Sequence, residues 1–587
     1  MSGHSETDYA DFWDGDLEED HQTESGSVEL VANDHRATRT QPHEYFEGKD
    51  FTCLDFAEMR RMKFKSIDEA ERFYNTYAKG VGFSIRREGS KIRRGIKRTK
   101  LWVCSKEGQR KIVRNKKSVH RSCRPITRVG CLARFRVQFD MKNNEWVVSQ
   151  FDVDHCHELM PVPHRVFLRS HRHVNVGAVD QAVAMKSSGI RTCEVHKLLA
   201  NEAGGGQNLG YTRKDLYNKL YRHSRSRISD GDANAVLMYM DGLRQSEKSF
   251  FYSFTKDEDR LDKLFWTDCK AVMDYAVFGD VIAFDTTYKK NTYNMPLVCI
   301  VGVNNHNQTI VFGFALVSNE REETFTWVLE EFMKAMGKKR PVSVVTDGDR
   351  AMQRAIEAVF PGARHRLCVW HLARNANSNI PNPEFVREFV GCMLRWCTTE
   401  EFDRAWWAMV GKFNLYENPW IIEKWDNREM WAQSYLAGHF FATIKSTSRC
   451  EGMNSYLKRY TRESGTLLEF VEQLNLAVAN ARMLELEEDF KAIFTKPVLS
   501  GDAFDQIEVH AGSLLTRKAF KMFQKELSRQ HLYFQTPNGF REDDTTAIYT
   551  LERYGEPGRA ITVQYNSFDR KFCCSCQKYE SESIMCK

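Results

Sequence analysis

The sequence has no hydrophobic run long enough to cross a membrane. Its longest apolar stretches, M-P-L-V-C-I-V-G-V and I-V-F-G-F-A-L-V, are far shorter than the roughly 20 residues of a membrane-spanning helix. The N-terminal segment also lacks the basic and then apolar pattern of a secretory signal peptide. We therefore expect an intracellular protein with no membrane partner. Its 16 cysteines would then lie in a reducing compartment, where metal binding or core packing is expected rather than disulfides.

One segment of the chain lacks basic residues and another has few acidic residues. Residues 1–20 contain eight Asp/Glu and no Lys/Arg, whereas residues 86–128 contain seventeen Lys/Arg and only two acids. Since the whole chain has a net charge of only +6, this basic concentration favours a polyanion partner. A solvated lysine-rich face is the plainer alternative. The acidic residues 1–60 are expected to be disordered, and their interleaved aromatic residues fit either an activation segment or an inert solubilising tail.

Residues 61–160 predict a small domain that contains one capped helix and a β-sheet. The middle strand alternates, so that Phe135 and Val137 face one way while Arg134 and Arg136 face the other. The sheet is therefore expected to have one apolar face and one basic face. The predicted elements are a helix over 66–80 that ends at Gly80 and strands at 100–105, 133–139 and 145–151.

The rest of the chain predicts an α+β multidomain protein. Residues 161–275 are polar and are expected to be a helical connector. From 276 to 480 the apolar pattern predicts three strands, a helix, a strand and a helix. That order is typical of an RNase H-like fold, which a Trp-rich helical insertion at about 383–445 interrupts. Residues 481–560 are expected to be helical or irregular.

Two aspartates stand at the ends of apolar strands, Asp285 in V-I-A-F-D-T-T-Y and Asp347 in V-S-V-V-T-D-G-D. A two-metal site for phosphoryl transfer needs carboxylates to hold two cations about 4 Å apart. Asp349 is the alternative to Asp347, but its position directly before a helix suits an N-cap. Glu451, on a predicted helix after the insertion, is the candidate third acid. Ordinary strand-ending aspartates and a surface glutamate are the alternative interpretation.

Four motifs carry a family resemblance: D-T-T-Y, T-D-G-D-R-A-M, H-R-L-C-V-W-H and C-E-G-M-N-S. They resemble the Mutator-like element transposase domain. Over roughly residues 60–587 the chain resembles the plant far-red-impaired-response family, which is derived from such transposases. The resemblance implies that the catalytic acids of the ancestor were Asp285, Asp347 and Glu451, with Mg²⁺ or Mn²⁺ as the ions. It also implies a C-x-x-H pair, Cys368 and His371, which would bind a local zinc ion or serve as a packed cysteine and a hydrogen-bonded histidine.

The basic sheet resembles the family's zinc finger, which is related to the WRKY and glial-cells-missing type. Tetrahedral zinc needs four Cys or His ligands, and two histidines at i and i+2 on a strand point the same way. Cys123 and Cys156 are competing candidates. The zinc ligands implied by the resemblance are Cys104, Cys131, His155 and His157, with the spacing C-x26-C-x23-H-x-H. The residues expected to bind DNA are Arg86, Arg87, Arg93, Arg94, Lys97, Arg98, Lys100, Arg134 and Arg136.

The tail, residues 561–587, resembles a SWIM zinc finger with the pattern C-x-C-x(n)-C-x-H. Cys574, Cys576 and Cys586 match its cysteines, and the printed sequence stops at Lys587, before the position of the histidine. An incomplete site is therefore expected. Either Cys573, water or a partner supplies the fourth ligand, or the full protein is longer.

Three functions follow from these observations. The first is a nuclear, zinc-dependent transcription regulator that binds double-stranded DNA and forms homo- or heterodimers with family members; the resemblance implies a role in light-regulated plant development. The second is an active Mutator-like DDE transposase that cleaves and transfers DNA strands. The third is a scaffold that binds proteins through the Trp-rich helices. The sequence favours them in this order.

Overall fold

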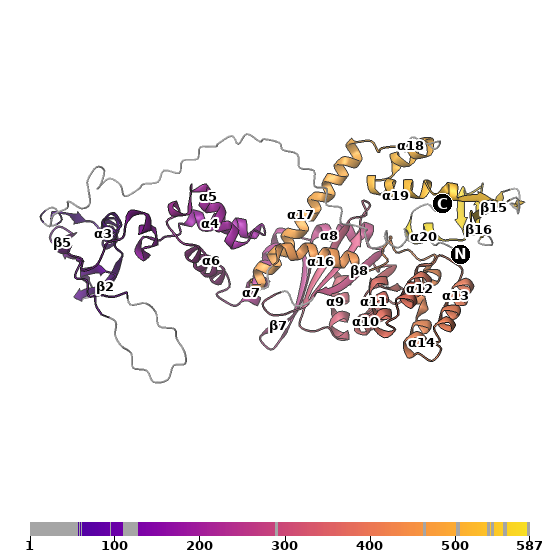
Figure 1. Ribbon diagram of the computed structural model, residues 1–587, viewed down its shortest axis with the longest axis horizontal. Coiled ribbons are helices and arrows are strands. Elements are labelled where there is room, and N and C mark those ends of the chain that lie inside the picture. Colours follow the sequence, from indigo (N-terminus) through magenta and orange to yellow (C-terminus); the bar gives the residue numbers. More distant parts are fainter. Residues whose placement is uncertain are drawn as a thin grey trace. The chain divides into compact units, whose positions relative to one another are not determined.

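The computed structural model divides into two compact units, Met1–His171 and Arg172–Lys587, and each is described by itself (Figure 1). No helix within the described ranges is both long and apolar enough to span a bilayer. The structure describes residues 57, 59, 61–93, 96–109, 127–287, 291–461, 465–500, 505–536, 540–541, 545–555 and 560–583.

The first unit is built on a five-stranded antiparallel sheet with the strand order β1-β5-β4-β3-β2. Helix α3 (Ile67–Val81) packs on it, and Ser66 caps the helix by accepting a hydrogen bond from the Glu69 N–H. The predicted end at Gly80 is two residues early, because Gly82, with φ +107°, takes the left-handed conformation that stops the helix. The strands are β1 (Lys63–Phe64), β2 (Ile85–Arg93), β3 (Ile96–Cys104), β4 (Arg134–Asp140) and β5 (Glu145–Asp152).

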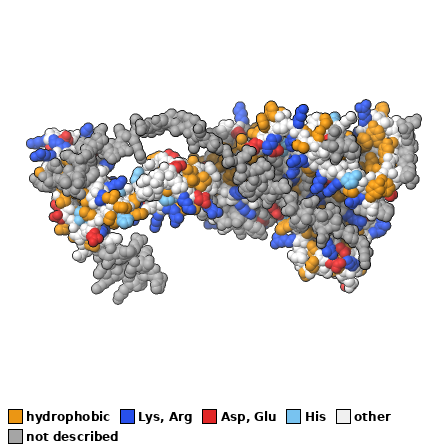
Figure 2. Space-filling view, turned by 45° about the horizontal axis from the view of Figure 1, so that its top comes forward, with side chains coloured by type: hydrophobic (Ala, Val, Ile, Leu, Met, Phe, Trp, Pro, Cys, Tyr) orange, Lys and Arg blue, Asp and Glu red, His pale blue; other side chains and the backbone are white. Residues whose placement is uncertain are grey.

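The core of this unit lies between the sheet and α3. Phe135 and Val137 of β4 are fully buried, and the Phe135 ring stacks 4.8 Å from the ring of Tyr74 on α3. Arg134 and Arg136 alternate with these residues and lie on the opposite face. The prediction of one apolar and one basic face holds for β4, whereas on β3 the apolar residues Leu101 and Val103 pair with Arg136 and Arg134 on the outer face. Some Lys and Arg side chains are visible on the surface of this unit in Figure 2.

The second unit is built on a seven-stranded sheet with the order β12-β11-β8-β9-β10-β7-β6. β8 runs antiparallel to β9 and parallel to β11, which is itself parallel to β12. The strands are β6 (Phe251–Asp257), β7 (Arg260–Thr267), β8 (Val281–Thr287), β9 (Leu297–Val303), β10 (Thr309–Val317), β11 (Ser343–Thr346) and β12 (Arg364–Leu367).

Helices cover both faces of this sheet. One face packs against α8 (Cys269–Phe278), α9 (Glu322–Ala335) and α10 (Arg350–Val359). The other packs against α7 (Asp232–Ser246), α16 (Ser448–Tyr460) and the first half of α17 (Leu467–Phe494). Because strands such as β9 are buried on both faces, they read as continuous apolar runs rather than as alternating patterns.

The expected helical connector over 161–275 is wrong in its second half. β6 and β7 lie within it and belong to the large sheet. The run Leu264–Phe265–Trp266 of β7 is buried on both faces, so its periodicity does not separate a strand from a helix. The first half is helical, with α4 (Val176–Ser187), α5 (Thr192–Glu202) and α6 (Arg213–Arg227).

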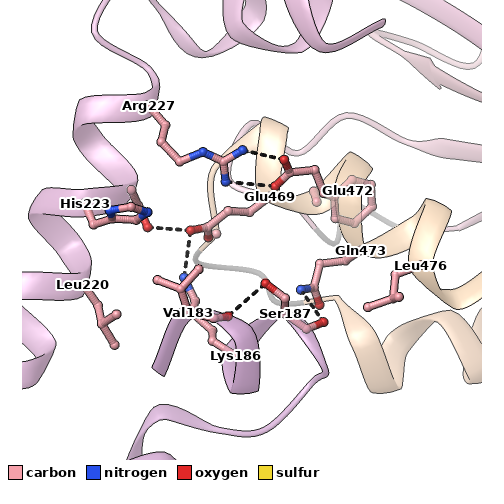
Figure 3. A pocket seen from close by; sticks show the side chains of 13 residues that line it. Val183, Lys186, Ser187, Leu220, His223, Arg227, Glu469, Glu472, Gln473 and Leu476 are labelled. Atoms are coloured by element: carbon pink, nitrogen blue, oxygen red, sulfur yellow. Dashed lines mark hydrogen bonds and ion pairs between the residues drawn. The ribbon is translucent and has the colours of Figure 1, made fainter. Parts of the chain in front are cut away.

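The α4–α6 helices have their own small core and attach to α17 through charged contacts. Lys186 Nζ lies 2.8 Å from Glu469, and the Ser224 hydroxyl donates to the same carboxylate at 2.5 Å. Arg227 and Glu472 form a second pair (Figure 3). These residues line a cavity of about 330 Å³. Because its charged groups are paired with one another, we interpret this cavity as a structural joint between the helices and α17.

A group of helices follows β12 and surrounds its own aromatic core. Trp406 and Trp431 are fully buried there, and the Trp431 indole N–H donates to the Lys424 carbonyl at 3.0 Å. These two tryptophans therefore form part of the core, whereas Trp407 is 41% exposed. The helices are α11 (Val369–Asn379), α12 (Pro383–Leu394), α13 (Thr399–Lys412), α14 (Pro419–Asp426) and α15 (Gln433–Leu436).

The expected helical or irregular region over 481–560 also contains strands. β13 (Tyr533–Gln535), β14 (Phe540–Arg541) and β15 (Thr546–Arg553) join a third sheet with β16 (Ala560–Asn566) and β17 (Lys571–Cys574). Most positions of β15 and β16 are only partly buried. The alternation of apolar and polar residues that predicts a strand from sequence is therefore weak here. The other elements here are α18 (Asp505–Leu514), α19 (Arg517–Leu527) and α20 (Lys578–Glu582).

Candidate metal centre and acidic edge

Four predicted ligands from three separate segments meet in the first unit. Cys104 ends β3, Cys131 precedes β4, and His155 and His157 follow β5. Cys104 Sγ lies 3.3 Å from His157 Nε2, and Cys131 Sγ lies 3.3 Å from His155 Nδ1. All four ligand atoms lie within 4.8 Å of one another, and no other group of three or more such side chains converges in this way within the described ranges.

The donor set and its spacing fit a tetrahedral metal ion. With metal–sulfur bonds of about 2.3 Å and metal–nitrogen bonds of about 2.0 Å, neighbouring ligand atoms of a tetrahedron are about 3.3–3.8 Å apart. The observed contacts are 3.2–3.3 Å. The competitor Cys156 is exposed, and its thiol contacts the Val129 carbonyl instead. Cys123 lies outside the described residues.

Burial sets the protonation of these groups in the absence of a metal ion. It raises the pKa of the Cys104 thiol to about 12, with a smaller contribution from the neighbouring Cys131, so this thiol stays protonated unless a cation is present. Burial, together with the nearby His157, lowers the pKa of His155 to about 4 and keeps its imidazole neutral, which is the form that binds metals. His157 Nδ1 lies 2.9 Å from the Glu158 carbonyl oxygen, a contact that leaves Nε2 as the ligand atom.

The basic residues divide into two groups that the sequence did not distinguish. Arg86 is paired with Glu88 and Glu107, and Arg87 lies on the side of α3, where its guanidinium donates to Glu71 at 2.7 Å. These three arginine–carboxylate pairs leave less charge for an external anion. Arg136 lies on the opposite face from α3, and Arg134 lies there too, 3.7 Å from Asp152. The side chain of Arg93 and the whole of Arg94 lie outside the described residues. Lys97, Arg98 and Lys100 belong to β3.

The two strand-end aspartates lie at one edge of the large sheet. Asp285 is in β8, and Asp347 directly follows β11, which pairs in parallel with β8. Parallel strands end at the same edge, which brings the two carboxylates into one region. The predicted N-cap is confirmed, because Asp349 accepts hydrogen bonds from the N–H groups of Ala351 and Met352 at the start of α10. Asp347 is therefore the aspartate left facing this edge.

The pKa of Asp285 is raised, as expected for a buried carboxylate that lies near other acids. Burial raises its pKa to about 6, and the negative charge of Asp347 and, more weakly, of Glu451 adds to the shift. Glu451 lies in the first turn of α16. The three predicted acids therefore act on one another electrostatically, although their oxygens do not form one of the converged groups described above.

The C-x-x-H pair lies beside the same edge. Burial alone would raise the pKa of the Cys368 thiol, but hydrogen bonds from His371 and Thr447 outweigh it and lower that pKa. The Thr447 N–H and hydroxyl both lie 3.3 Å from Cys368 Sγ, and the hydroxyl lies 3.4 Å from His371 Nδ1. Thr447, which the sequence did not single out, precedes α16 and so connects this pair to the helix of Glu451.

The tail places two of its predicted ligands together. Cys574 is buried at the end of β17, and its Sγ lies 3.1 Å from Cys576 Sγ. Cys573 is exposed, and Cys586 lies outside the described residues. A hydrogen bond of 2.9 Å from the Phe441 N–H to the Ser581 carbonyl and a 2.9 Å ion pair between Lys445 and Glu582 hold α20 against the loop after α15.

Known families match both regions. The FAR1 DNA-binding domain matches residues 72–161, which contain the four converged ligands, and the MULE transposase domain matches residues 281–375, which contain Asp285 and Asp347. A DNA-binding domain followed by a transposase domain defines the class, a DNA-binding protein derived from a transposase. The chain belongs to the FAR1 family, which is derived from Mutator-like transposases.

The chain is similar to several proteins of Arabidopsis thaliana. FAR1-RELATED SEQUENCE 5 is 33% identical over 556 residues, which cover 92% of this chain and 70% of the relative. FAR-RED IMPAIRED RESPONSE 1 is 28% identical over 548 residues, covering 91% of this chain and 65% of the relative. The chain thus spans about two thirds of the length of these relatives.

Removing one converged ligand is expected to remove one metal ion. Cys131→Ala leaves three ligands, of which only Cys104 is a thiol, so the purified full chain should bind one equivalent of metal less than the wild type. Elemental mass spectrometry after gel filtration measures this. Cys156→Ala, a cysteine of the same segment outside the cluster, is the matched control and should keep the full metal content. Equal metal content in the two variants would contradict the assignment.

Replacing Asp285 by a neutral residue is expected to stabilise the folded protein in a pH-dependent way. Its raised pKa means that the folded protein binds this proton more tightly than the unfolded chain does, so stability falls as the pH rises from about 4 to about 6. Above pH 6, in the presence of chelator, Asp285→Asn should therefore be more stable than the wild type by roughly 1–3 kcal/mol. Urea unfolding at pH 7.5 and pH 4.5 measures the difference, which should shrink at the lower pH. Asp230 is an exposed carboxylate, so Asp230→Asn should leave the stability unchanged at both pH values. A gain in stability for Asp285→Asn that does not depend on pH would refute the mechanism.

Proposed function

We propose that this chain is a nuclear, zinc-dependent, DNA-binding transcription regulator built on a former transposase. The observation that carries the proposal is the convergence of Cys104, Cys131, His155 and His157 at the edge of a sheet whose outer face carries two arginines of β4. This cluster lies inside the segment that matches the FAR1 DNA-binding domain. A basic sheet face complements DNA phosphates, which supply most of the affinity of such proteins.

Zinc is the metal that best suits the donors. Two thiolates and two neutral imidazoles in a tetrahedral arrangement are typical of structural zinc, whereas Mg²⁺ and Ca²⁺ prefer oxygen. When bound, zinc would neutralise the buried thiolates and hold the three segments together. The ligands are contributed by the end of β3, the segment that leads into β4 and the segment after β5. The ion would therefore fix the relative positions of these strands and of the arginines on β4.

The nuclear and physiological parts of the proposal rest on DNA binding and on the relatives. A regulator of transcription acts on nuclear DNA, and one similar protein is named for an impaired response to far-red light. By analogy we infer a role in light-regulated plant development. The printed name belongs to that relative, and the inference to this chain rests on 28% identity over 548 residues.

We further propose an RNase H-like fold for residues 276–480 and a SWIM-type zinc site in the tail. The strand order β10-β9-β8-β11-β12, with the first three strands antiparallel and the last two parallel to β8, supports the first proposal. The 3.1 Å contact between Cys574 and Cys576 supports the second, with Cys586 as the expected third ligand.

Active transposition is the second candidate function. It is favoured by the mutual influence of Asp285, Asp347 and Glu451 at the edge of the large sheet. Bound Mg²⁺ or Mn²⁺ would supply charge stabilisation for the attacking and leaving oxygens of a phosphodiester. The chain's own contribution is to hold three carboxylates at one edge and to keep Asp285 ready to ionise when a cation approaches.

Arg136 is expected to contact a DNA phosphate. Arg136→Ala should weaken binding of the full chain to a mixed-sequence duplex by roughly threefold to tenfold and reduce the slope of log affinity against log salt by about 1. Fluorescence anisotropy across a salt series measures both. Arg87→Ala removes the same charge from the side of the sheet where Glu71 already neutralises it, and it should leave the slope unchanged. Equal slopes for the two variants would show that the outer face is not the DNA-binding face.

The regulator and the transposase differ in what they do to DNA. We expect the wild-type chain to bind duplex DNA without nicking it in the presence of Mg²⁺ or Mn²⁺, as measured with a supercoiled plasmid and end-labelled duplexes. If metal-dependent nicking occurs and Asp285→Asn abolishes it while preserving DNA binding, the transposase function replaces the regulator. Nicking that survives Asp285→Asn comes from a contaminant.

A further inference from the structure

Helix α6 carries a concentration of positive charge between the two segments that match known families. Its residues 213–227 include six Lys/Arg and a single acid, Asp215. The FAR1 match ends at residue 161 and the MULE match begins at residue 281, so neither of them accounts for this charge. The basic helix therefore needs an explanation of its own.

The packing of α6 fixes which of its sides faces outward. α4, α5 and α6 form one group of helices around a shared core, in which Leu216 and Leu220 of α6 are buried (Figure 1). α4 and α5 are joined by only four residues, 188–191, and Gly189 among them has φ +88°. A short connection with a glycine is typical of a helix-turn-helix pair, to which α6 adds the third helix.

The outward side of α6 is polar and basic along its length. His223 and Arg227 lie on the side that faces α17 (Figure 3). The exposed residues of the opposite side recur at steps of three and four residues, which places them on one face of the helix. They are Lys214, Tyr217, Asn218, Tyr221, Arg222 and Arg225.

The cations of this face are available to an external anion. Among the residues that the structure describes, no carboxylate forms an ion pair with Lys214, Arg222 or Arg225. Asp215 does not neutralise them, because it caps the start of the helix and lies 3.1 Å from Arg172. The face therefore presents three unpaired positive charges within four turns of one helix.

We propose that this face of α6 binds duplex DNA, as a second DNA contact besides the sheet of the first unit. An α-helix with its side chains is about 10–12 Å across, which fits the roughly 12 Å width of the major groove. A three-helix group that places its third helix in this groove is a common DNA-binding arrangement. Lys214, Arg222 and Arg225 would neutralise phosphates, and the exposed Tyr217 and Tyr221 hydroxyls would donate to phosphate oxygens.

The shape of the surface favours duplex DNA over other nucleic acids. α6 presents a convex face, whereas proteins bind single strands in a groove that follows the backbone. The major groove of an RNA duplex is too deep and narrow for side chains to read. The inference rests on the proposed DNA-binding function for its choice of polyanion. It concerns a different unit of the chain, however, so the two proposals fail separately.

Fluorescence anisotropy of the full chain on a mixed-sequence duplex, across a salt series, tests the proposal. Lys214→Ala/Arg222→Ala/Arg225→Ala should weaken binding about tenfold to hundredfold at physiological salt. It should also lower the slope of log affinity against log salt by about 2–3, since each phosphate contact contributes about 0.9.

A matched control removes the same charge elsewhere in the second unit. Arg260, Arg340 and Arg404 are exposed and lie outside α6, so replacing all three by Ala should change the slope by less than about 0.5. If this control lowers the slope as much as the α6 variant does, the effect comes from the net charge of the chain and the proposal is wrong.

A charge-conserving variant separates DNA contact from damage to the fold. Lys214→Arg/Arg222→Lys/Arg225→Lys keeps every positive charge and should retain the wild-type slope, because phosphate contacts depend on charge. Circular dichroism checks that each variant is folded. A conserving variant that loses as much affinity as the alanine variant would overturn the proposal.

Arg136→Ala distinguishes failure of this inference from failure of the proposed function. If the sheet of the first unit does not bind DNA, Arg136→Ala leaves the slope unchanged while the α6 alanine variant still lowers it. If Arg136→Ala lowers the slope and the α6 alanine variant does not, the present inference alone is wrong. It is also wrong if the α6 substitutions weaken binding to single-stranded DNA or to duplex RNA as much as binding to duplex DNA.

Discussion

The first unit depends on one constraint: four side chains that are up to 53 positions apart in the sequence must reach a single point. Cys104 and Cys131 are fully buried, and without an ion the Cys104 thiol is held protonated by that burial. A metal reverses this balance, since it stabilises the thiolates and uses imidazoles that burial already keeps neutral. β4, which follows the ligand Cys131, carries Arg134 and Arg136 on its outer face. A bound metal ion would therefore also fix the positions of these two arginines.

A second constraint acts at the edge of the large sheet, where the negative charges of Asp347 and Glu451 disfavour ionisation of the buried Asp285. Asp285 remains there although burial and Asp347 disfavour its ionisation. Cys368, His371 and Thr447 form a hydrogen-bonded connection from this edge to the helix of Glu451. A buried carboxylate beside other acids lowers the stability of the fold, which a purely structural region would not need. The arrangement is understandable in a domain of transposase ancestry. Geometry preserved from an ancestor does not require present catalysis, which is why the DNA-binding sheet carries the proposed function.

Local patterns predicted the parts of the molecule that local physics controls. The alternation around Phe135 fixed the two faces of β4, and the position of Asp349 before a helix identified it as a cap. Long-range pairing was not predictable in the same way. Nothing in the sequence around Trp266 shows that β7 joins β10, and the pairing of Arg87 with Glu71 depends on the packing of α3 against the sheet. The four ligands were found through a family resemblance, because gaps of 26 and 23 residues carry little spacing information.

The most direct test of the account is X-ray absorption at the zinc edge on the full chain carrying Cys574→Ser and Cys576→Ser, which removes the described tail thiols. The account predicts one zinc ion per chain with two sulfur neighbours at about 2.3 Å and two nitrogen neighbours at about 2.0–2.1 Å. A first shell made only of oxygen and nitrogen, or a chain that folds and binds DNA without zinc, would contradict it.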